Sequence, residues 1–410
     1  MNTKPQQPLL HDVGIIALVP DEWGPVWMDR HHVLSRLAGY FNVVWMYQPG
    51  WRQTISALHS RRFSSKVYPK PGALYVYEPR FWLPRLGRPA WLGQYTARRR
   101  FKQVCDHLRA QGCTKVVLYL WGLEYADTLG QVPHDLSIYN VSDEYSFSST
   151  EVPVSPAERS LLESVGQVFI ISPALMEKKG RFNPNTEFIP AGVDYWRYAT
   201  PRPEPDDLRE IPHPRIGYLG HLKRMLDWSL LLKLSAMHPE WSFVFVGPKR
   251  PHPEIDDALK QISQRPNVYF LGGKPADRLG DYIQHFDVCT MPYRMDDYTK
   301  YIYPGKMHEY LASGKPVVSA PIRSVEEFRH VITLASNCEE WSNAIERALS
   351  DKEIAPGRCL ERQMVAREYD WEALVHRIAC TIAGRLGLAV PNNVLSGAER
   401  PPVMTSLASR

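Results

Sequence analysis

Two series of short apolar segments, separated by a proline-rich break, constrain the fold of this chain more than any other feature. The first series lies within residues 1–199 and the second within residues 215–360. The break at 200–214, TPRPEPDDLREIPHP, holds five prolines and a group of acidic residues. This composition leaves little to bury, so it predicts a linker between two domains.

The first series predicts a parallel sheet. Its segments are rich in β-branched and aromatic residues, and several lack alternation, as expected of strands covered on both faces. Between the first two, Trp27, Leu34 and Ala38 recur at helical spacing, which gives a strand–helix–strand unit. We expect strands at 13–19, 42–47, 74–78, 115–120, 136–140 and 167–171.

The second series repeats this alternation and predicts a second α/β domain. Two such domains facing each other bind ligands in the cleft between the carboxyl ends of their strands. We expect residues 361–390 to form C-terminal helices, for which a return to the first domain is one arrangement, and residues 391–410 to form a flexible tail. The expected strands are 215–220, 242–247, 267–272, 286–291 and 316–320, with helices at 225–237, 276–284 and 304–313.

Composition narrows the class of protein. The chain has 49 Lys and Arg against 44 Asp and Glu, a net charge of +5 over 410 residues, which is too small to argue for nucleic acid. The six cysteines show no CxxC pair and no zinc-like spacing, which favours reduced thiols and a cytoplasmic protein. No apolar run approaches the ~18 residues of a membrane span, and the N-terminus lacks a signal-peptide pattern.

The segment 286–321, FDVCTMPYRMDDYTKYIYPGKMHEYLASGKPVVSAP, is the most informative. Pro304 is placed to start a helix and Gly314 to end it. Within that helix Lys306 and Glu309 are three residues apart, so they lie side by side. A solvated ion pair is the alternative to a functional role for these two residues.

The loop before this helix carries Thr299 and Lys300. A helix N-terminus flanked by Lys300 and Lys306 is a natural site for a diphosphate. Glu309, one turn further along, is well placed to accept hydrogen bonds from a ribose diol.

The pattern Pro-x-Lys-x-x-Glu-Tyr-Leu-Ala-x-Gly-Lys-Pro-Val-Val, from Pro304 to Val318, resembles the donor-site helix of two-domain GT-B glycosyltransferases. The similar group is the large retaining family 4, also called glycosyl transferases group 1. RIGYLGHL, HPEWSFVFVGP (238–248) and IPAGVD (189–194) agree with it in order and spacing. The resemblance covers about 165–325 in sequence and the N-terminal half only in architecture. It implies a GT-B fold of two Rossmann-like α/β/α domains.

The resemblance also assigns roles to residues. It implies that the diphosphate and its leaving charge are met by Lys306 and Lys300. Two positions depart from the family pattern: Tyr301 stands where many members have a first glutamate, and His221 stands where they have an arginine. Lys223 or Arg224 is one substitute for that arginine, and Lys300 with Lys306 is another. The implied nucleotide-sugar-binding residues are Glu309, Gly220, His221, Lys223, Gly247, Gly272, Thr299, Tyr301, Pro304 and Gly305.

The acceptor side is expected in the first domain. By analogy, the segment 21–32 is a flexible acceptor-side loop, in which Gly24 gives the backbone freedom and Trp27 stacks on sugar faces. Packing in the core is the alternative for Trp27. Asp143 and Glu144 follow the fifth strand and are candidates for an acceptor contact, with Asp143 also a candidate general base. A polar turn is the alternative for both.

The segment 80–102, RFWLPRLGRPAWLGQYTARRRFK, interleaves aromatic residues with arginines. One interpretation is a surface that lies on an anionic bilayer, with Trp82, Trp91 and Tyr95 at the headgroups. The other is a helix of the first domain with a charged face. Nucleic acid fits less well, because no binding motif accompanies the charge.

The leading hypothesis is therefore a glycosyltransferase that moves a hexose from a nucleotide-diphosphate sugar to a sugar or lipid-linked sugar, with retention, in surface polysaccharide assembly. The nucleotide sugar is a substrate, with UDP and GDP both open, and we expect no metal and no cofactor. We expect a cytoplasmic protein, with peripheral contact at the inner membrane face as a further option. The alternatives are a sugar-nucleotide 2-epimerase of the same fold and a non-catalytic partner subunit.

Overall fold

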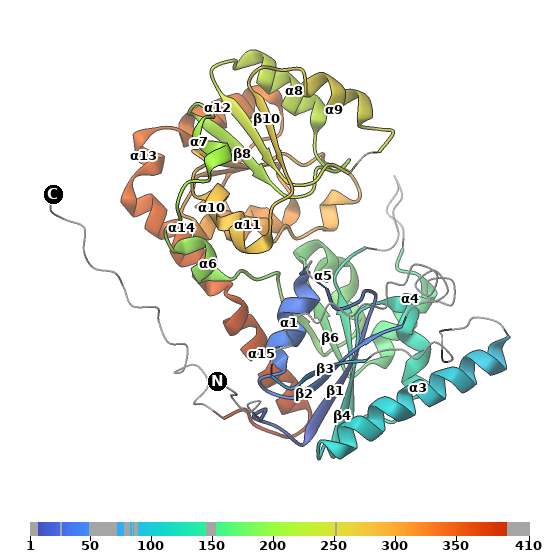
Figure 1. Ribbon diagram of the computed structural model, residues 1–410. Helices are drawn as coiled ribbons and strands as arrows, with labels where there is room; N and C mark the ends of the chain where they lie inside the picture. Colours follow the sequence, from blue (N-terminus) through green and yellow to red (C-terminus); the bar gives the residue numbers. More distant parts are fainter. Residues whose placement is uncertain are drawn as a thin grey trace.

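The computed structural model describes residues 7–24, 27–48, 72–77, 83, 85, 89–144, 153–250 and 252–391. It contains two parallel sheets, each flanked by helices, one above the other in Figure 1. The α/β prediction is thereby confirmed. Of the predicted tail 391–410, only residue 391 belongs to the described part. Most of the segment 80–88 and all of residues 145–149 also lie outside the described residues.

The first sheet has seven strands in the order β3-β2-β1-β4-β5-β6-β7. Every residue of β1 is buried, because helices cover both faces. The edge strand β7 was not predicted, since its three residues are only partly buried and carry no apolar pattern. The strands are β1 (Val13–Val19), β2 (Asn42–Tyr47), β3 (Leu74–Val76), β4 (Lys115–Leu120), β5 (Leu136–Val141), β6 (Gln167–Ile170) and β7 (Thr186–Phe188).

Capping serines fix where two helices of the first domain begin. Ser155 and Ser172 each accept a hydrogen bond from a backbone N–H three residues on, and a proline follows each of them. This combination satisfies an otherwise unpaired donor and pre-sets the first helical φ angle. The helices are α1 (Asp29–Leu37), α3 (Ala90–Ala110), η1 (Leu123–Gly130), α4 (Pro156–Ser164), α5 (Pro173–Lys179) and η2 (Gly180–Phe182).

The second sheet has six strands in the order β10-β9-β8-β11-β12-β13. Its two-residue edge strand β13 was too short to predict. The strands are β8 (Arg215–Leu219), β9 (Ser242–Val246), β10 (Val268–Gly272), β11 (Val288–Met291), β12 (Val317–Ser319) and β13 (Thr333–Leu334). The helices of this domain are α8 (Trp228–Met237), α9 (Asp256–Ile262), η3 (Ala276–Arg278), α10 (Leu279–Ile283), η4 (Thr299–Tyr301), α11 (Lys306–Ala312), η5 (Arg323–Phe328), α12 (Cys338–Ala348) and α13 (Asp351–Ile354).

The proline-rich stretch 200–214 is ordered, contrary to the expectation that it has little to bury. It contains α7 (Asp206–Arg209), and both Leu208 and Ile211 are buried in the core of the second domain. The buried guanidinium of Arg215 holds it from the inside, with Nε donating to the carbonyl of Ile211 at 2.8 Å. The chain instead crosses between the domains just before this stretch, at α6 (Tyr195–Ala199).

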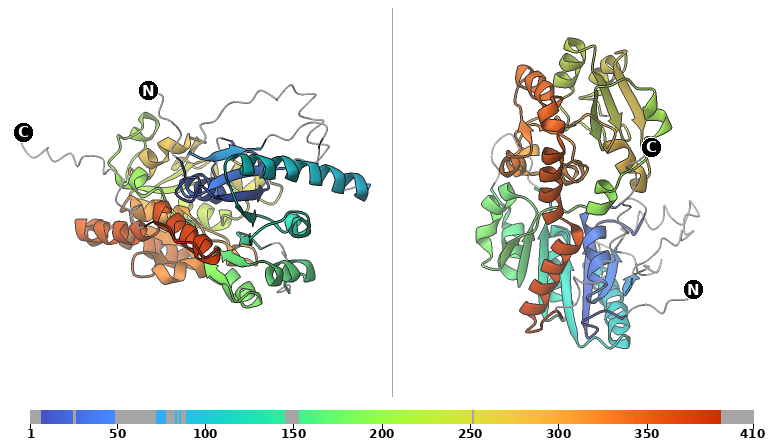
Figure 2. Two further views of the ribbon diagram at one scale, coloured as in Figure 1. Left: turned by 90° about the horizontal axis from the view of Figure 1, so that it is seen from below. Right: turned by 90° about the vertical axis from the view of Figure 1, so that its left-hand side faces the viewer.

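The chain crosses between the domains a second time near its C-terminus. Helix α14 (Pro356–Glu368) packs beside α11 of the second domain, and α15 (Trp371–Arg385) lays its apolar face into the core of the first domain (Figure 2). The predicted helical region 361–390 therefore consists of two helices separated at Tyr369 and Asp370. Asp370 caps α15 and also accepts from the backbone N–H of Tyr195 at 3.1 Å, so the two crossings lie side by side.

Candidate active site

Two glycines bring the ends of β8 and β9 unusually close. Gly220 and Gly247 have φ angles of +140° and +149°, which L-residues rarely adopt. A Cβ built on Gly247 would lie 2.0 Å from the carbonyl oxygen of Gly220, and one on Gly220 would lie 3.1 Å from Nζ of Lys306. Bare backbone is therefore required at both strand ends, next to the lysine that begins α11.

The ammonium of Lys306 is held between two phenols. Its Nζ donates to Oη of Tyr293 at 2.7 Å and to Oη of Tyr218 at 3.1 Å. Burial acts to lower the pKa of Lys306, but the two tyrosine oxygens outweigh it and hold the pKa above its ordinary value. The side chain therefore stays charged and fixed at the sheet edge where both strands end. The helix begins at Lys306 itself, two residues later than the start predicted at Pro304.

Glu309 lies one turn further along α11 and reaches the crossing between the domains. Its Oε1 accepts a hydrogen bond from the hydroxyl of Tyr198 at 2.9 Å. Burial raises the pKa of Glu309, while Tyr198 and the charge of Lys306 lower it in part. Lys306 and Glu309 thus lie side by side as predicted. Both side chains are partly buried, so the two residues do not form an exposed ion pair on the surface.

Three basic residues lie near Lys306 in the loops after β8 and β9. His221 and Lys223 follow β8, and Arg250 follows β9, with a guanidinium nitrogen 3.3 Å from Nε2 of His221. The pKa values of His221 and Lys223 are lowered by burial first and then by the charged residues around them. His221 is therefore uncharged near neutral pH, and we call Lys223, Arg250 and Lys306 the cation group.

Asp143 brings the first domain to this group. It follows β5 and is partly buried, and burial is the main reason that its pKa is raised. Its charge raises the pKa of Lys223 and that of Tyr298, both in the second domain. The carboxylate of Asp143 thus acts electrostatically on Lys223 of the cation group, and its assignment to the acceptor or to a general base stays a prediction.

Three predicted site residues turn out to be buried within the protein. Thr299 is fully buried, and its hydroxyl donates to the carbonyl of Arg294 at 2.6 Å, so it closes its own loop. The carboxylate of Glu144 is buried beside the ammonium groups of Lys178 and Lys179, at 3.2 and 3.4 Å. Tyr301 is buried too, with the ammonium of Lys178 5.0 Å from its ring centroid. These positions correct the expected ligand contacts of all three residues, because their polar atoms or rings serve local packing.

The remaining donor-side candidates lie around α11 and β10. Lys300 is exposed, with its ammonium 5.3 Å from the ring centroid of Tyr301. Pro304 is buried, and Gly305 caps α11 close to Ala191 of the first domain. Gly272 ends β10 with a φ of +71° and open space around its Cβ position.

The acceptor-side candidates of segment 21–32 lie next to α1. Gly24 has no positive φ, and a Cβ there would meet only the carbonyl of Glu22, at 3.9 Å. The residues that follow, 25 and 26, lie outside the described part. Trp27 is 39% exposed, and its ring contacts His32 edge-on at 5.1 Å. Trp27 is thus partly exposed and also contacts Trp23 and His31, which fits stacking and packing alike.

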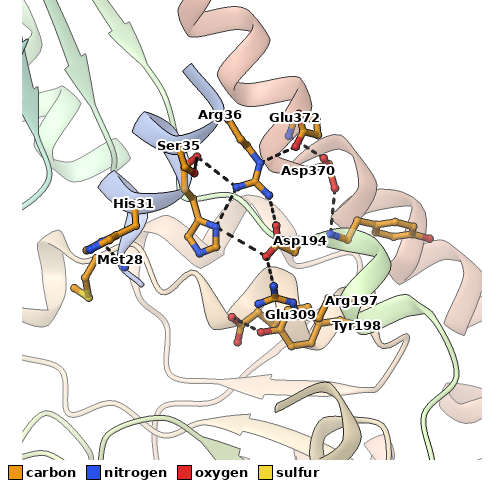
Figure 3. A network of polar contacts seen from close by, with 12 residues as sticks. Met28, His31, Ser35, Arg36, Asp194, Arg197, Tyr198, Glu309, Asp370 and Glu372 are labelled. Carbon is orange, nitrogen blue, oxygen red and sulfur yellow. Dashed lines mark hydrogen bonds and ion pairs between the residues drawn. The ribbon is translucent and has the colours of Figure 1, made fainter. Parts of the chain in front are cut away.

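A polar network runs from α1 to Glu309 (Figure 3). Asp194, at the first crossing between the domains, pairs with Arg36 of α1 and with Arg197 of α6. His32 lies 3.9 Å from the same carboxylate. Since Tyr198 follows Arg197 on α6, this network fixes the segment that holds Glu309.

Four residues of the site were not found from the sequence: Tyr198, Tyr218, Arg250 and Tyr293. A tyrosine near a strand end looks like any core aromatic residue, and Arg250 is far from α11 along the chain. The available signal was that Arg250 comes three residues after Gly247, just past the end of β9, because ligands bind at the carboxyl ends of parallel strands. No group of three or more His, Cys, Asp and Glu in the described part could hold a metal ion. Likewise, none of the described helices is long and apolar enough to cross a membrane.

Comparisons with known proteins concern the family and the fold. Residues 213–351 match the family model described as Glycosyl transferases group 1. Over 204 residues the chain is 27% identical to TuaH of Bacillus subtilis (strain 168), which is assigned as a teichuronic acid biosynthesis glycosyltransferase. That match covers 46% of this chain and 48% of TuaH, so the chain spans about half the length of the curated relative it matches.

Solved structures share the whole architecture. Sucrose-phosphate synthase from Thermosynechococcus elongatus aligns with a TM-score of 0.66 at 15% identity, over 89% of this chain and 97% of that one. An E. coli structure titled trehalose-6-phosphate, bound with UDP-2-fluoro glucose, aligns with a TM-score of 0.62 at 14% identity, over 92% and 100%. The predicted GT-B fold is confirmed, and so is the resemblance to glycosyl transferases group 1 over residues 213–351. The retaining subclass stays a prediction.

Proposed function

We propose that this GT-B protein transfers a hexose from a nucleotide-diphosphate sugar to a sugar or lipid-linked sugar acceptor, with retention of anomeric configuration. The observation that carries this proposal is the position of Lys306. Its ammonium is fixed by two tyrosine hydroxyls beside the bare backbone of Gly220, with Glu309 one turn away. A charged, oriented donor at a glycine-lined strand end suits a diphosphate.

The reaction needs charge stabilisation on the leaving group. As the bond between C1 of the sugar and the diphosphate oxygen breaks, negative charge grows on the diphosphate, and Lys306 is already in place to meet it. In a retaining transfer the acceptor oxygen attacks C1 from the same face, and its proton passes to the departing diphosphate. Because the cation group supplies the positive charge, we propose that the transfer requires no metal.

Glu309 is assigned to the ribose. One carboxylate oxygen is occupied by Tyr198, which leaves the other to accept from a ribose hydroxyl. We propose UDP as the first nucleotide to test, because a protein of the same fold is titled as bound with UDP-2-fluoro glucose. GDP is the second.

The acceptor is assigned to the first domain, opposite the cation group. The charge of Asp143, in the first domain, raises the pKa of Lys223, and we propose that Asp143 contacts the acceptor hydroxyl. The name of the relative TuaH refers to teichuronic acid biosynthesis, which supports an acceptor from a cell-surface polysaccharide or exopolysaccharide.

We also propose that the protein works in the cytoplasm, at the inner face of the membrane, where lipid-linked acceptors lie. All six cysteines, each within the described part, are free thiols, as suits a reducing compartment. On α3, Trp91 is 70% exposed and Tyr95 is 50% exposed. Exposed arginines follow them along this helix, a composition typical of interfacial segments.

The membrane proposal is tested with vesicles. Binding of the full chain should rise with the fraction of anionic lipid and fall with salt, and replacing Trp91 and Tyr95 by Ala should weaken it. Equal binding to neutral and anionic vesicles, or no binding to either, would contradict the proposal.

The catalytic proposal is tested with a panel of UDP-, GDP- and ADP-sugars. A donor present at 100 times its dissociation constant should stabilise the protein by ~2.7 kcal/mol in thermal shift. The stabilising donor is then incubated with and without a carbohydrate acceptor, and products are read by NMR. Acceptor-dependent transfer with a retained anomeric configuration is expected. Epimerised donor without acceptor would indicate the 2-epimerase, and stable binding without turnover would indicate a non-catalytic subunit.

A further inference from the structure

The loop after β9 is hydrogen-bonded to the loop after β8. The backbone N–H of Leu222 donates to the carbonyl of Pro248 at 3.0 Å, and that of Arg250 donates to the carbonyl of Leu222 at 2.9 Å. These bonds extend the pairing of the two strands past their ends. Arg250 is therefore held beside His221, although the two residues are far apart in the chain.

The side chains of Arg250 and His221 have fixed roles in their contact. A guanidinium has donors and no acceptor, so at 3.3 Å Arg250 donates and Nε2 of His221 accepts. Burial, together with Lys223, Arg250 and Lys306, lowers the pKa of His221, which keeps its ring neutral and able to accept. His221 thus orients the guanidinium.

The neighbouring cations point elsewhere. Lys249 adjoins Arg250 in sequence, but its ammonium lies 3.9 Å from the ring centroid of Phe270 and 3.3 Å from the hydroxyl of Ser263. Arg224 follows Lys223 and lies 3.8 Å from the carboxylate of Glu254. By contrast, Arg250 and Lys223 both act electrostatically on His221, and Arg250 also acts on Lys223.

We propose that Arg250 is a second donor to the diphosphate of the nucleotide sugar, and that His221 is its positioning residue rather than a ligand contact. This inference rests on the proposed function, because it takes the ligand to be a nucleoside diphosphate. A planar guanidinium suits two phosphate oxygens, and the crowding of Arg250 with Lys223 and Lys306 suits a ligand of high negative charge.

The test is calorimetric titration of the full chain with UDP, GDP, and uridine or guanosine. Arg250→Ala should weaken binding of the nucleoside diphosphate by about tenfold to a hundredfold, as expected for a charge-assisted hydrogen bond, and leave binding of the nucleoside nearly unchanged. Lys249→Ala is the matched control, since it removes an adjacent charge that points away. It should bind like the wild type.

The role of His221 is tested with two substitutions, one that removes its hydrogen-bond acceptor and one that keeps an acceptor. His221→Ala should lose part of the diphosphate affinity, and His221→Gln should regain it, because the amide oxygen also accepts from Arg250. The double variant His221→Ala with Arg250→Ala should be no weaker than Arg250→Ala alone. Additive losses would show that His221 contacts the ligand by itself.

The outcomes separate this inference from the proposed function. If neither UDP nor GDP binds the wild-type chain, the proposed function fails. If one binds and Arg250→Ala binds it equally well, with thermal unfolding showing both proteins folded, the role of Arg250 is overturned and the proposed function stands. Equal losses for nucleoside and diphosphate would likewise overturn it.

Discussion

The hydroxyl of Tyr198 donates a hydrogen bond of 2.9 Å to Oε1 of Glu309. Tyr198 belongs to α6, where the chain passes between the domains, and Glu309 belongs to α11 in the second domain. The carboxylate assigned to the ribose is therefore tied to the crossing segment, which Asp194 and Arg36 anchor on the first domain.

Tyr198→Phe should change the pH dependence of donor binding. Burial raises the pKa of Glu309, and the hydrogen bond from Tyr198 lowers it in part. Losing that bond raises the pKa further, so the carboxylate is protonated at a higher pH and donor affinity falls earlier on acidification. Dissociation constants measured between about pH 4.5 and pH 8 should show the acid limb displaced upward in Tyr198→Phe. An unchanged midpoint would contradict the coupling.

Gly247→Ala should destabilise the protein far more than Gly272→Ala. Both glycines have positive φ angles, so each substitution strains the backbone. A Cβ at 247 would also lie 2.0 Å from a backbone oxygen of Gly220, whereas a Cβ at 272 meets nothing within 4 Å. Urea unfolding of the two variants should differ by more than about 1 kcal/mol. Equal losses would mean that the two strand ends are not tightly apposed.

Acid should destabilise the fold through His31. Burial lowers its pKa from 6.5 to about 4, so the unfolded chain binds a proton over a pH range in which the folded one does not. Stability is thus complete above about pH 6.5 and declines as the pH falls towards 4, by about 2 kcal/mol at pH 5 from this group. His31→Asn, which does not titrate, should lose less stability between pH 7 and pH 5 than the wild type. The pKa of His32 is also lowered to about 4, so His32 accounts for part of the loss of stability that remains in His31→Asn. An equal dependence of stability on pH in the two proteins would refute the assignment to His31.

A chain that ends at residue 355 should be poorly soluble. It lacks α14, which covers α11, and α15, whose Trp371, Leu374 and Ile378 lie in the core of the first domain. Both domains would then expose apolar surface. Soluble yield and dye binding to exposed apolar surface report the change, and behaviour like that of the full chain would show that these helices are dispensable.

The fold was largely predictable because its central strands are buried on both faces. Segments such as 13–19 and 242–247 show no alternation of apolar and polar residues, as expected of strands that are covered on both faces. The edge strands β7 and β13 are short and half-buried, so only pairing with a neighbour defines them. The stretch 200–214 was expected to bury little because it is rich in proline. Its residues Leu208 and Ile211 are nevertheless buried.

The site was predictable only where it is local. Lys306 and Glu309 share one helix, so their spacing alone places them together. Glu144 and Thr299 were assigned to ligands because a sequence does not distinguish a polar group that faces a ligand from one that is buried and paired. Arg250 is brought to His221 by strand pairing, which no local pattern displays.

The most direct measurement is the steady-state kinetics of Glu309→Ala and Lys306→Met with the donor that stabilises the wild type, beside Lys249→Ala as a control. Glu309→Ala should weaken donor binding by about tenfold to more than a hundredfold. Lys306→Met keeps the side chain's length without its charge, so it should lower kcat more than it weakens donor binding, because the diphosphate gains charge in the transition state. Wild-type kinetics in both variants would contradict the assigned site and the proposed transfer with it.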